Sequence, residues 1–128
     1  MSSSDSQTVW RIFTMEDGRS SMEPVEVPLE ASGRGGGASK LLAGKGVVIR
    51  KIARGGVPDW HTAPLRQMTA TISGEGEIET GDGQVIHLVP GVVLLLEDTH
   101  GDGHITRTLG ESDRIALFLP LDEETTLP

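Results

Sequence analysis

Cysteine and tyrosine are absent from this sequence of 128 residues, and aromatic residues make up only 3% of it. Without cysteine the chain can form no disulfide, has no thiolate nucleophile and offers no sulfur ligand to a metal. With so few aromatic rings, a sugar-stacking surface or an aromatic cage for quaternary ammonium ions is disfavoured.

Positive charge is also scarce. The 11 Lys and Arg residues are outnumbered by 19 Asp and Glu residues, which gives a formal net charge of −8. Because phosphate binding needs clustered basic residues, we expect neither nucleic acid nor an anionic membrane as a partner. No apolar run approaches the ~18 residues that cross a bilayer, and the N-terminus lacks the basic-then-apolar order of a signal peptide. We therefore expect a cytoplasmic protein whose partner is a small molecule.

Helical periodicity is missing too, whereas the chain holds 17 glycines and 7 prolines. Its length is that of one domain. About nine or ten short strands, with turns roughly every eight to twelve residues, predict an all-β sandwich or closed barrel. The strands are predicted at 8–14, 22–29, 46–53, 67–72, 75–80, 84–89, 92–96, 104–109 and 114–119.

Local signals refine these strands. Pro24 and Pro28 predict an edge position for residues 22–29. An Asp-Gly pair between 75–80 and 84–89 predicts a hairpin. The continuous apolar run 92–96 is typical of a strand that is buried on both faces.

Three flanking segments lack such patterns. Residues 1–7 are polar and serine-rich, which predicts a disordered lead. Residues 31–43 include a glycine-rich stretch without a Walker-type motif, and we interpret them as a flexible loop. Residues 121–128 form an acidic tail.

The stretch 55–74 predicts a polar strand face. Residues from Gln67 onward include β-branched side chains and stop at Ser73-Gly74, as a strand would. Side chains alternate between faces, so one face carries polar groups without charge if the strand is regular through Pro64. A small wet cavity accounts for such a face. Its residues are His61, Ala63, Leu65, Gln67, Thr69 and Thr71.

The spacing of this stretch resembles the first motif of the cupin superfamily, G-x5-H-x-H-x3-E-x6-G. The frame fits at every step from Gly55 through His61 to Gly74. Two metal-ligand positions differ, because Ala63 replaces the second histidine and Gln67 replaces the glutamate.

A second stretch, 91–108, resembles the second cupin motif, G-x5-P-x-G-x2-H-x3-N. Glu97 stands at the proline and Thr99 at the glycine. The motif histidine falls on His104 when two residues are inserted in 99–103.

The resemblance spans residues 47–119 and implies a fold. We expect a cupin-like antiparallel jelly-roll β-barrel, formed as a single domain by residues 8–120. The family also implies a homodimer.

Acid–base chemistry inside the barrel is the leading interpretation. His61 and His104 stand at or near motif histidines, and an imidazole exchanges protons near neutral pH. Glu97 and Asp98 are adjacent, so we expect only one of the two carboxylates to face the cavity and act as a base. Gln67 would orient a substrate carbonyl or hydroxyl. The predicted catalytic residues are His61, Gln67, His104 and Asp98.

Further residues are candidates for contact with the substrate. They flank the catalytic positions, although alternation places Trp60 on the opposite face, where packing is expected. The substrate-binding candidates are Leu65, Thr69, Thr71, Trp60 and Glu97. His87 is interpreted as a surface or subunit-contact residue.

A metal site is the alternative for the same residues. Fe, Mn, Ni or Zn would be held by His61, Gln67 and His104, with His100 as a further ligand if the turn at 99–103 folds inward. Such a site has two imidazoles and an amide but lacks the carboxylate that divalent metals favour, so affinity should be reduced. The cofactor is therefore either none or one divalent transition metal.

Three functions remain open. The first is a lyase, isomerase or cyclase that acts on a small molecule by acid–base or electrostatic catalysis. The second is a metal-dependent cupin dioxygenase. The third is a non-catalytic cupin that binds a small ligand.

Overall fold

The structure is a computed structural model that describes residues 5–33, 35–56 and 58–127. Strands are its only regular elements, and this part of the chain contains no helix that could span a membrane. The strands are β1 (Asp5–Thr14), β2 (Ser20–Ala31), β3 (Gly37–Ala38), β4 (Val48–Ile52), β5 (Gln67–Ser73), β6 (Glu75–Glu79), β7 (Val85–Leu88), β8 (Val93–Leu96), β9 (Ile105–Leu109) and β10 (Arg114–Pro120).

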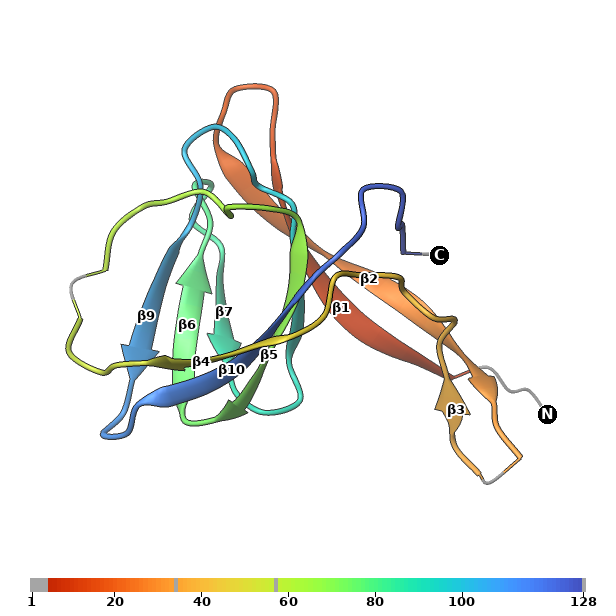
Figure 1. The fold of residues 1–128 in the computed structure, drawn as a ribbon. Coiled ribbons are helices and arrows are strands. Elements are labelled where there is room, and N and C mark those ends of the chain that lie inside the picture. Colours follow the sequence, from red (N-terminus) through yellow and green to blue (C-terminus); the bar gives the residue numbers. More distant parts are fainter. Residues whose placement is uncertain (1–4, 34, 57, 128) are drawn as a thin grey trace.

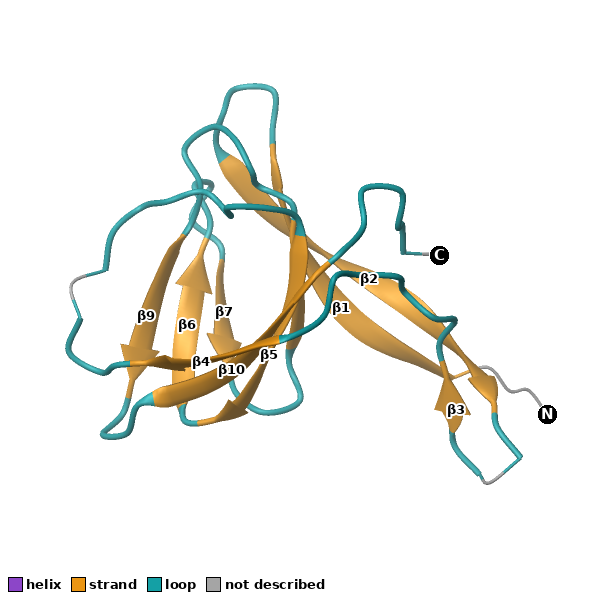
Figure 2. Ribbon diagram, in the orientation of Figure 1, coloured by secondary structure: helices purple, strands orange, loops and turns teal. Residues whose placement is uncertain are grey.

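Two sheets contain all of these strands (Figures 1 and 2). The larger sheet has the order β3-β2-β1-β8-β5-β10-β4, and the smaller has the order β7-β6-β9. The chain passes from the large sheet to the small one at Gly74, whose φ is 77°. A Cβ at this position would lie 2.7 Å from the backbone oxygen of Asp113, so only glycine fits the corner.

The later strands pair as nested antiparallel partners. β4 pairs with β10, β5 pairs with β8, and β6 pairs with β7. Between the first two pairs, an isolated bridge joins His61 to His104, which directly precedes β9. Nesting of this kind is the plan of a double-sheet jelly roll. The prediction of an all-β jelly roll is confirmed, and the arrangement is compatible with the cupin fold.

Two features differ from a fully antiparallel closed barrel. β1 runs parallel to β8, because the β1–β2 hairpin is added from outside the nested pairs and no short turn fixes its direction. The large and small sheets also face each other without hydrogen bonds closing their edges, since no strand pairing joins them among the described residues.

Apolar side chains form one core on each face of strand β8. Between the two sheets lie buried residues such as Leu94, Leu96 and Ile78. On the other face, Leu95 packs with Val9 and with partners from β2 and the C-terminal segment. Burial on both faces explains the continuous apolar run predicted at 92–96.

Flanking segments are more structured than expected. Strand β1 begins at Asp5, within the lead 1–7 that we predicted to be disordered, and residues 1–4 lie outside the described part. Strand β2 continues through its prolines, since Pro28 pairs with Ser6 of β1. On its other side β2 pairs only with the two-residue strand β3. In the acidic tail, Leu121 is buried and Leu127 packs against the outer core, because these apolar side chains cover the back of the large sheet.

Candidate functional site

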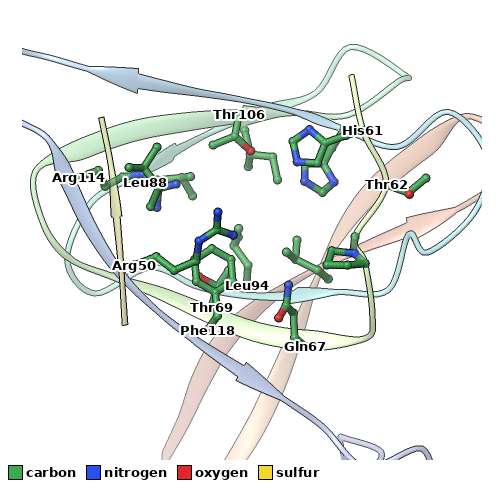
Figure 3. Close-up of a pocket in the computed structure, with 16 residues that line it drawn as sticks. Arg50, His61, Thr62, Gln67, Thr69, Leu88, Leu94, Thr106, Arg114 and Phe118 are labelled. Carbon is green, nitrogen blue, oxygen red and sulfur yellow. The ribbon is translucent and has the colours of Figure 1, made fainter. Parts of the chain in front are cut away.

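A cavity of about 490 Å³ lies between the two sheets. This is within the size range of small-molecule sites in proteins, roughly 300–1,000 Å³. Figure 3 shows side chains from both sheets and from the segment before β5 pointing into it. Its lining consists of Arg50, Ile52, His61, Thr62, Ala63, Pro64, Gln67, Thr69, Ile78, Leu88, Leu94, Leu96, His104, Thr106, Arg114 and Phe118.

Backbone pairing brings the two motif histidines together. The amide of His61 donates to the carbonyl of His104 and the reverse bond also forms, each at 2.9 Å. Gly103 allows this close approach, because a Cβ there would lie 2.1 Å from the carbonyl oxygen of His61. As a result the two imidazole rings meet edge to face, with centroids 4.8 Å apart.

His104 is held by a buried carboxylate. Its Nδ1 lies 2.5 Å from Oδ2 of Asp98, and the two residues are 3% and 0% exposed. An ionised carboxylate only accepts hydrogen bonds, so Nδ1 is the donor in this contact and Nε2 is not engaged by it. The second oxygen of Asp98, Oδ1, has no partner in the described protein. Asp98 therefore fixes the tautomer and the orientation of the imidazole.

His61 occupies the exposed rim of the same site. Its Nδ1 lies 3.0 Å from the backbone oxygen of Asp59. A carbonyl can only accept, so Nδ1 of this ring also donates. Both histidines thus have one nitrogen engaged by the protein, and no hydrogen bond to the other is formed by the described residues.

Strand β5 provides the polar floor of the cavity. Gln67 and Thr69 lie on the same face of the strand, as alternation predicted, and both are buried. Oγ1 of Thr69 has no hydrogen-bond partner in the described residues. A ligand hydroxyl or carbonyl in the cavity could therefore bond to this oxygen or to the Gln67 amide.

Arg50 and Arg114 line the end of the cavity that lies away from His61 (Figure 3). Sequence reasoning did not single them out, because an arginine near a strand end is usually solvated. A signal was present, since Arg114 alternates with Ala116 and Phe118 and so shares their inward face. Burial, followed by the nearby charge of Arg50, lowers the pKa of Arg114.

The adjacent side chains of Glu97 and Asp98 point in opposite directions, as alternation predicts. Asp98 points inward to His104, whereas Glu97 points outward. Oε1 of Glu97 accepts a hydrogen bond from Arg11 and Oε2 accepts one from Arg66, both at 2.5 Å. Burial opposes ionisation of Glu97, but these two bonds outweigh it and lower its pKa. Glu97, which follows β8, thus links β1 to the residue that precedes β5 instead of lining the cavity.

Other predicted residues lie outside the cavity lining. Leu65 is 40% exposed, because residues 62–66 are not a regular strand and the alternation expected through Pro64 is lost. Trp60, which alternation placed on the face opposite the cavity, is 42% exposed. His100 is exposed in the turn at 99–103, which folds away from the cavity. Thr71 accepts a hydrogen bond from Nη1 of Arg114 at 3.1 Å, so it holds a lining residue but does not line the cavity itself.

A metal is poorly matched to the donors present. No group of three His, Cys, Asp or Glu side chains able to hold an ion occurs in residues 5–33, 35–56 and 58–127. His61 and His104 offer two imidazole nitrogens, while Asp98 is committed to His104. The remaining side-chain oxygens of the described lining are all neutral, namely the amide of Gln67 and the hydroxyls of Thr62, Thr69 and Thr106. The set does not fit the three-ligand site that a metal-dependent oxygenase needs.

Comparisons with known proteins add little. No protein-family model matches the chain, and no curated protein matches it. A solved structure from Salmonella typhimurium LT2, assigned as an ethanolamine utilization protein Q, aligns over 92% of this chain and 99% of its own. The sequence identity is 11% and the TM-score is 0.39. At this level the match identifies neither a family nor a function.

Proposed function

We propose that the cavity binds a small organic molecule and that His104, oriented by Asp98, transfers a proton to or from it. The observation that carries this proposal is the buried pair itself, with 2.5 Å between Nδ1 and Oδ2, on a histidine that lines the cavity. A base that is held in one tautomer by a buried carboxylate is the arrangement used for proton transfer in many enzymes.

Burial explains why such a pair is more than a surface contact. A carboxylate that is 0% exposed costs several kcal/mol of desolvation, on the order of the attraction it gains from one partner. The pair is most useful when His104 becomes an imidazolium, because the negative charge of Asp98 then stabilises the charge that develops during proton transfer. A purely structural histidine would not require a charged partner.

The remaining lining residues suit an acid–base reaction. His104 Nε2 would take a proton from a carbon next to a carbonyl, and the electron pair would form an enolate. Gln67 and Thr69 would donate hydrogen bonds to oxygens of the ligand, and His61 at the rim would return or relay the proton. Return of the proton elsewhere gives an isomerase, whereas departure of a leaving group gives a lyase.

Hydrogen exchange tests the proposal without knowledge of the natural substrate. The protein would be incubated in D₂O with small oxo acids and hydroxy ketones, and NMR would follow loss of the proton next to the carbonyl. The wild-type protein should accelerate exchange for at least one compound. The exchange rate with the His104→Ala variant should be about 10²–10⁴-fold lower than with the wild type.

A matched control removes a histidine outside the cavity. His100→Ala lies in the exposed turn, so its exchange rate should equal that of the wild type. Equal rates in the wild-type protein and in His104→Ala, with the compound shown to bind, would refute the assignment. Binding without any exchange would instead favour a non-catalytic binding protein.

A further inference from the structure

Arg114 is a buried guanidinium without a negative partner. It is 4% exposed, and no carboxylate among the described residues lies within salt-bridge distance of it. Its Nη1 donates to Thr71, but its Nε has no hydrogen-bond partner in that part of the chain. Arginine is rarely buried in this way unless it is paired.

The rest of the cavity increases the need for negative charge. Arg50 lies close enough that its charge lowers the pKa of Arg114, and its own guanidinium sits 5.2 Å from the ring centroid of Phe118. The described cavity lining contains two arginines and two histidines but no Asp or Glu. This contrasts with the chain as a whole, whose net charge is −8.

Gly76 leaves space for the Arg114 side chain between the two sheets. A Cβ on Gly76 of β6 would lie 3.1 Å from Nε and 3.2 Å from Cδ of Arg114. Glycine at this point of the small sheet lets the arginine reach between the sheets. A side chain placed only to cap a strand end would turn to solvent, where its charge costs less.

Water alone does not balance this charge. A void of about 10 Å³ lies beside Arg114, Thr69 and Thr71, and it is roughly the size of one water. A water there would provide hydrogen bonds but no negative charge. Two neighbouring guanidinium groups at the end of a cavity instead match an oxyanion, which accepts paired N–H bonds.

The geometry points to an oxyanion subsite at Arg114 and Arg50, so that the molecule bound in the cavity carries a carboxylate or a phosphate at the end away from His61. This inference deepens the proposed function and rests on it only in taking the cavity to be a ligand site. The oxyanion would be held by Arg114, while the opposite end of the ligand would face the imidazoles of His61 and His104.

Calorimetry with three probes tests the subsite. Succinate and inorganic phosphate represent the two kinds of oxyanion, and succinamide is the uncharged analogue of succinate. We expect succinate or phosphate to bind the wild-type protein and succinamide not to bind. The Arg114→Gln variant, which keeps an amide donor for Thr71, should weaken binding at least about tenfold.

Three variants make the test specific. Arg50 is exposed, so the Arg50→Gln variant should fold normally. It should also weaken anion binding, and it still tests the subsite if Arg114→Gln does not fold. Arg107→Gln removes an equal charge from an arginine that pairs with Glu77 and Glu79, and it should bind like the wild type. Without ligand, Arg114→Gln should resist urea at least as well as the wild type, because it removes an uncompensated charge.

The inference is overturned if neither anion binds the wild-type protein, or if the foldable arginine variants bind as tightly as the wild type. The arginine variants test the subsite and His104→Ala tests the catalytic proposal, so the two can fail separately. Anion binding through Arg114 without proton exchange would reject the catalytic proposal alone. Exchange of an oxo acid that is insensitive to Arg114→Gln and Arg50→Gln would reject the subsite alone.

Discussion

The Asp98→Asn substitution is the sharpest perturbation of the proposed chemistry. Asparagine has nearly the same shape as aspartate, and its oxygen can still accept the hydrogen bond from Nδ1 of His104. The substitution removes the negative charge of a side chain that is 0% exposed and replaces Oδ1, which has no partner among the described residues, with an amide NH2 group. We therefore expect folding to survive while proton transfer by His104 is impaired.

The size of the effect follows from the geometry of the pair. The bonded atoms are 2.5 Å apart, so the centres of charge on the carboxylate and an imidazolium lie farther apart. At a separation of about 4 Å and an effective dielectric constant of ~20, two unit charges attract by about 4 kcal/mol. Loss of that attraction as the imidazolium forms corresponds to roughly a thousandfold lower rate.

Deuterium exchange and urea unfolding measure the two halves of this prediction. Exchange catalysed by Asp98→Asn should fall by roughly a thousandfold relative to the wild type. The free energy of unfolding should change by less than about 2 kcal/mol, because a neutral amide avoids the desolvation cost of the buried carboxylate. A wild-type exchange rate in this variant would refute the role of Asp98, even if the protein binds its ligand normally.

Three further predictions concern stability. Glu97→Gln removes the charge that two arginines share, so urea unfolding should show a loss of about 2 kcal/mol, and unchanged stability would contradict the ion-pair role. Burial opposes ionisation of Asp82, but side-chain hydrogen bonds outweigh it and lower its pKa to about 2. The ionised side chain therefore stabilises the fold above the ordinary aspartate pKa of ~4, and this stabilisation is lost as pH falls toward 2. After solvent screening the loss is no more than about 1 kcal/mol. Acid titration of Asp82→Asn should lack this component, and an unaltered acid profile would contradict it. Gly103→Ala should lower the free energy of unfolding by about 3 kcal/mol or more, because the added Cβ would lie 2.1 Å from the carbonyl oxygen of His61. Thermal unfolding followed by circular dichroism measures this loss, and a variant of normal stability would contradict it.

Much of the fold could be predicted because strands follow local rules. The Asp-Gly turn between β6 and β7 and the glycine corner after β5 mark hairpins and sheet changes in the sequence itself. The run 92–96 is apolar throughout because β8 is buried on both faces. The parallel pairing of β1 with β8 has no local signal, since it joins segments far apart in the chain.

The site was predictable only where alternation holds. Gln67 and Thr69 lie on the regular strand β5, and both line the cavity. Leu65 precedes that strand, so its predicted direction fails together with the regular backbone. Alternation indicated that Glu97 and Asp98 would face opposite ways but could not say which faced inward, because this depends on how β8 pairs with β1 and β5.

Arg114 illustrates the limit most clearly. Its residue type favours a solvated strand end, and only packing against the small sheet shows that the guanidinium is buried. The cost of burying a charge is a property of the whole environment, which no short stretch of sequence contains.

The most direct test of the account is a long-range ¹H–¹⁵N NMR spectrum of the histidine side chains. We expect that His104 is protonated on Nδ1, that its Nε2 carries no proton, and that the ¹⁵N signal of this Nε2 shifts when a cavity ligand is added. Exposed His100 provides an internal reference that should not shift. A His104 protonated on Nε2, or one that does not respond to a ligand shown to bind, would contradict the central claim that Asp98 prepares this imidazole for proton transfer.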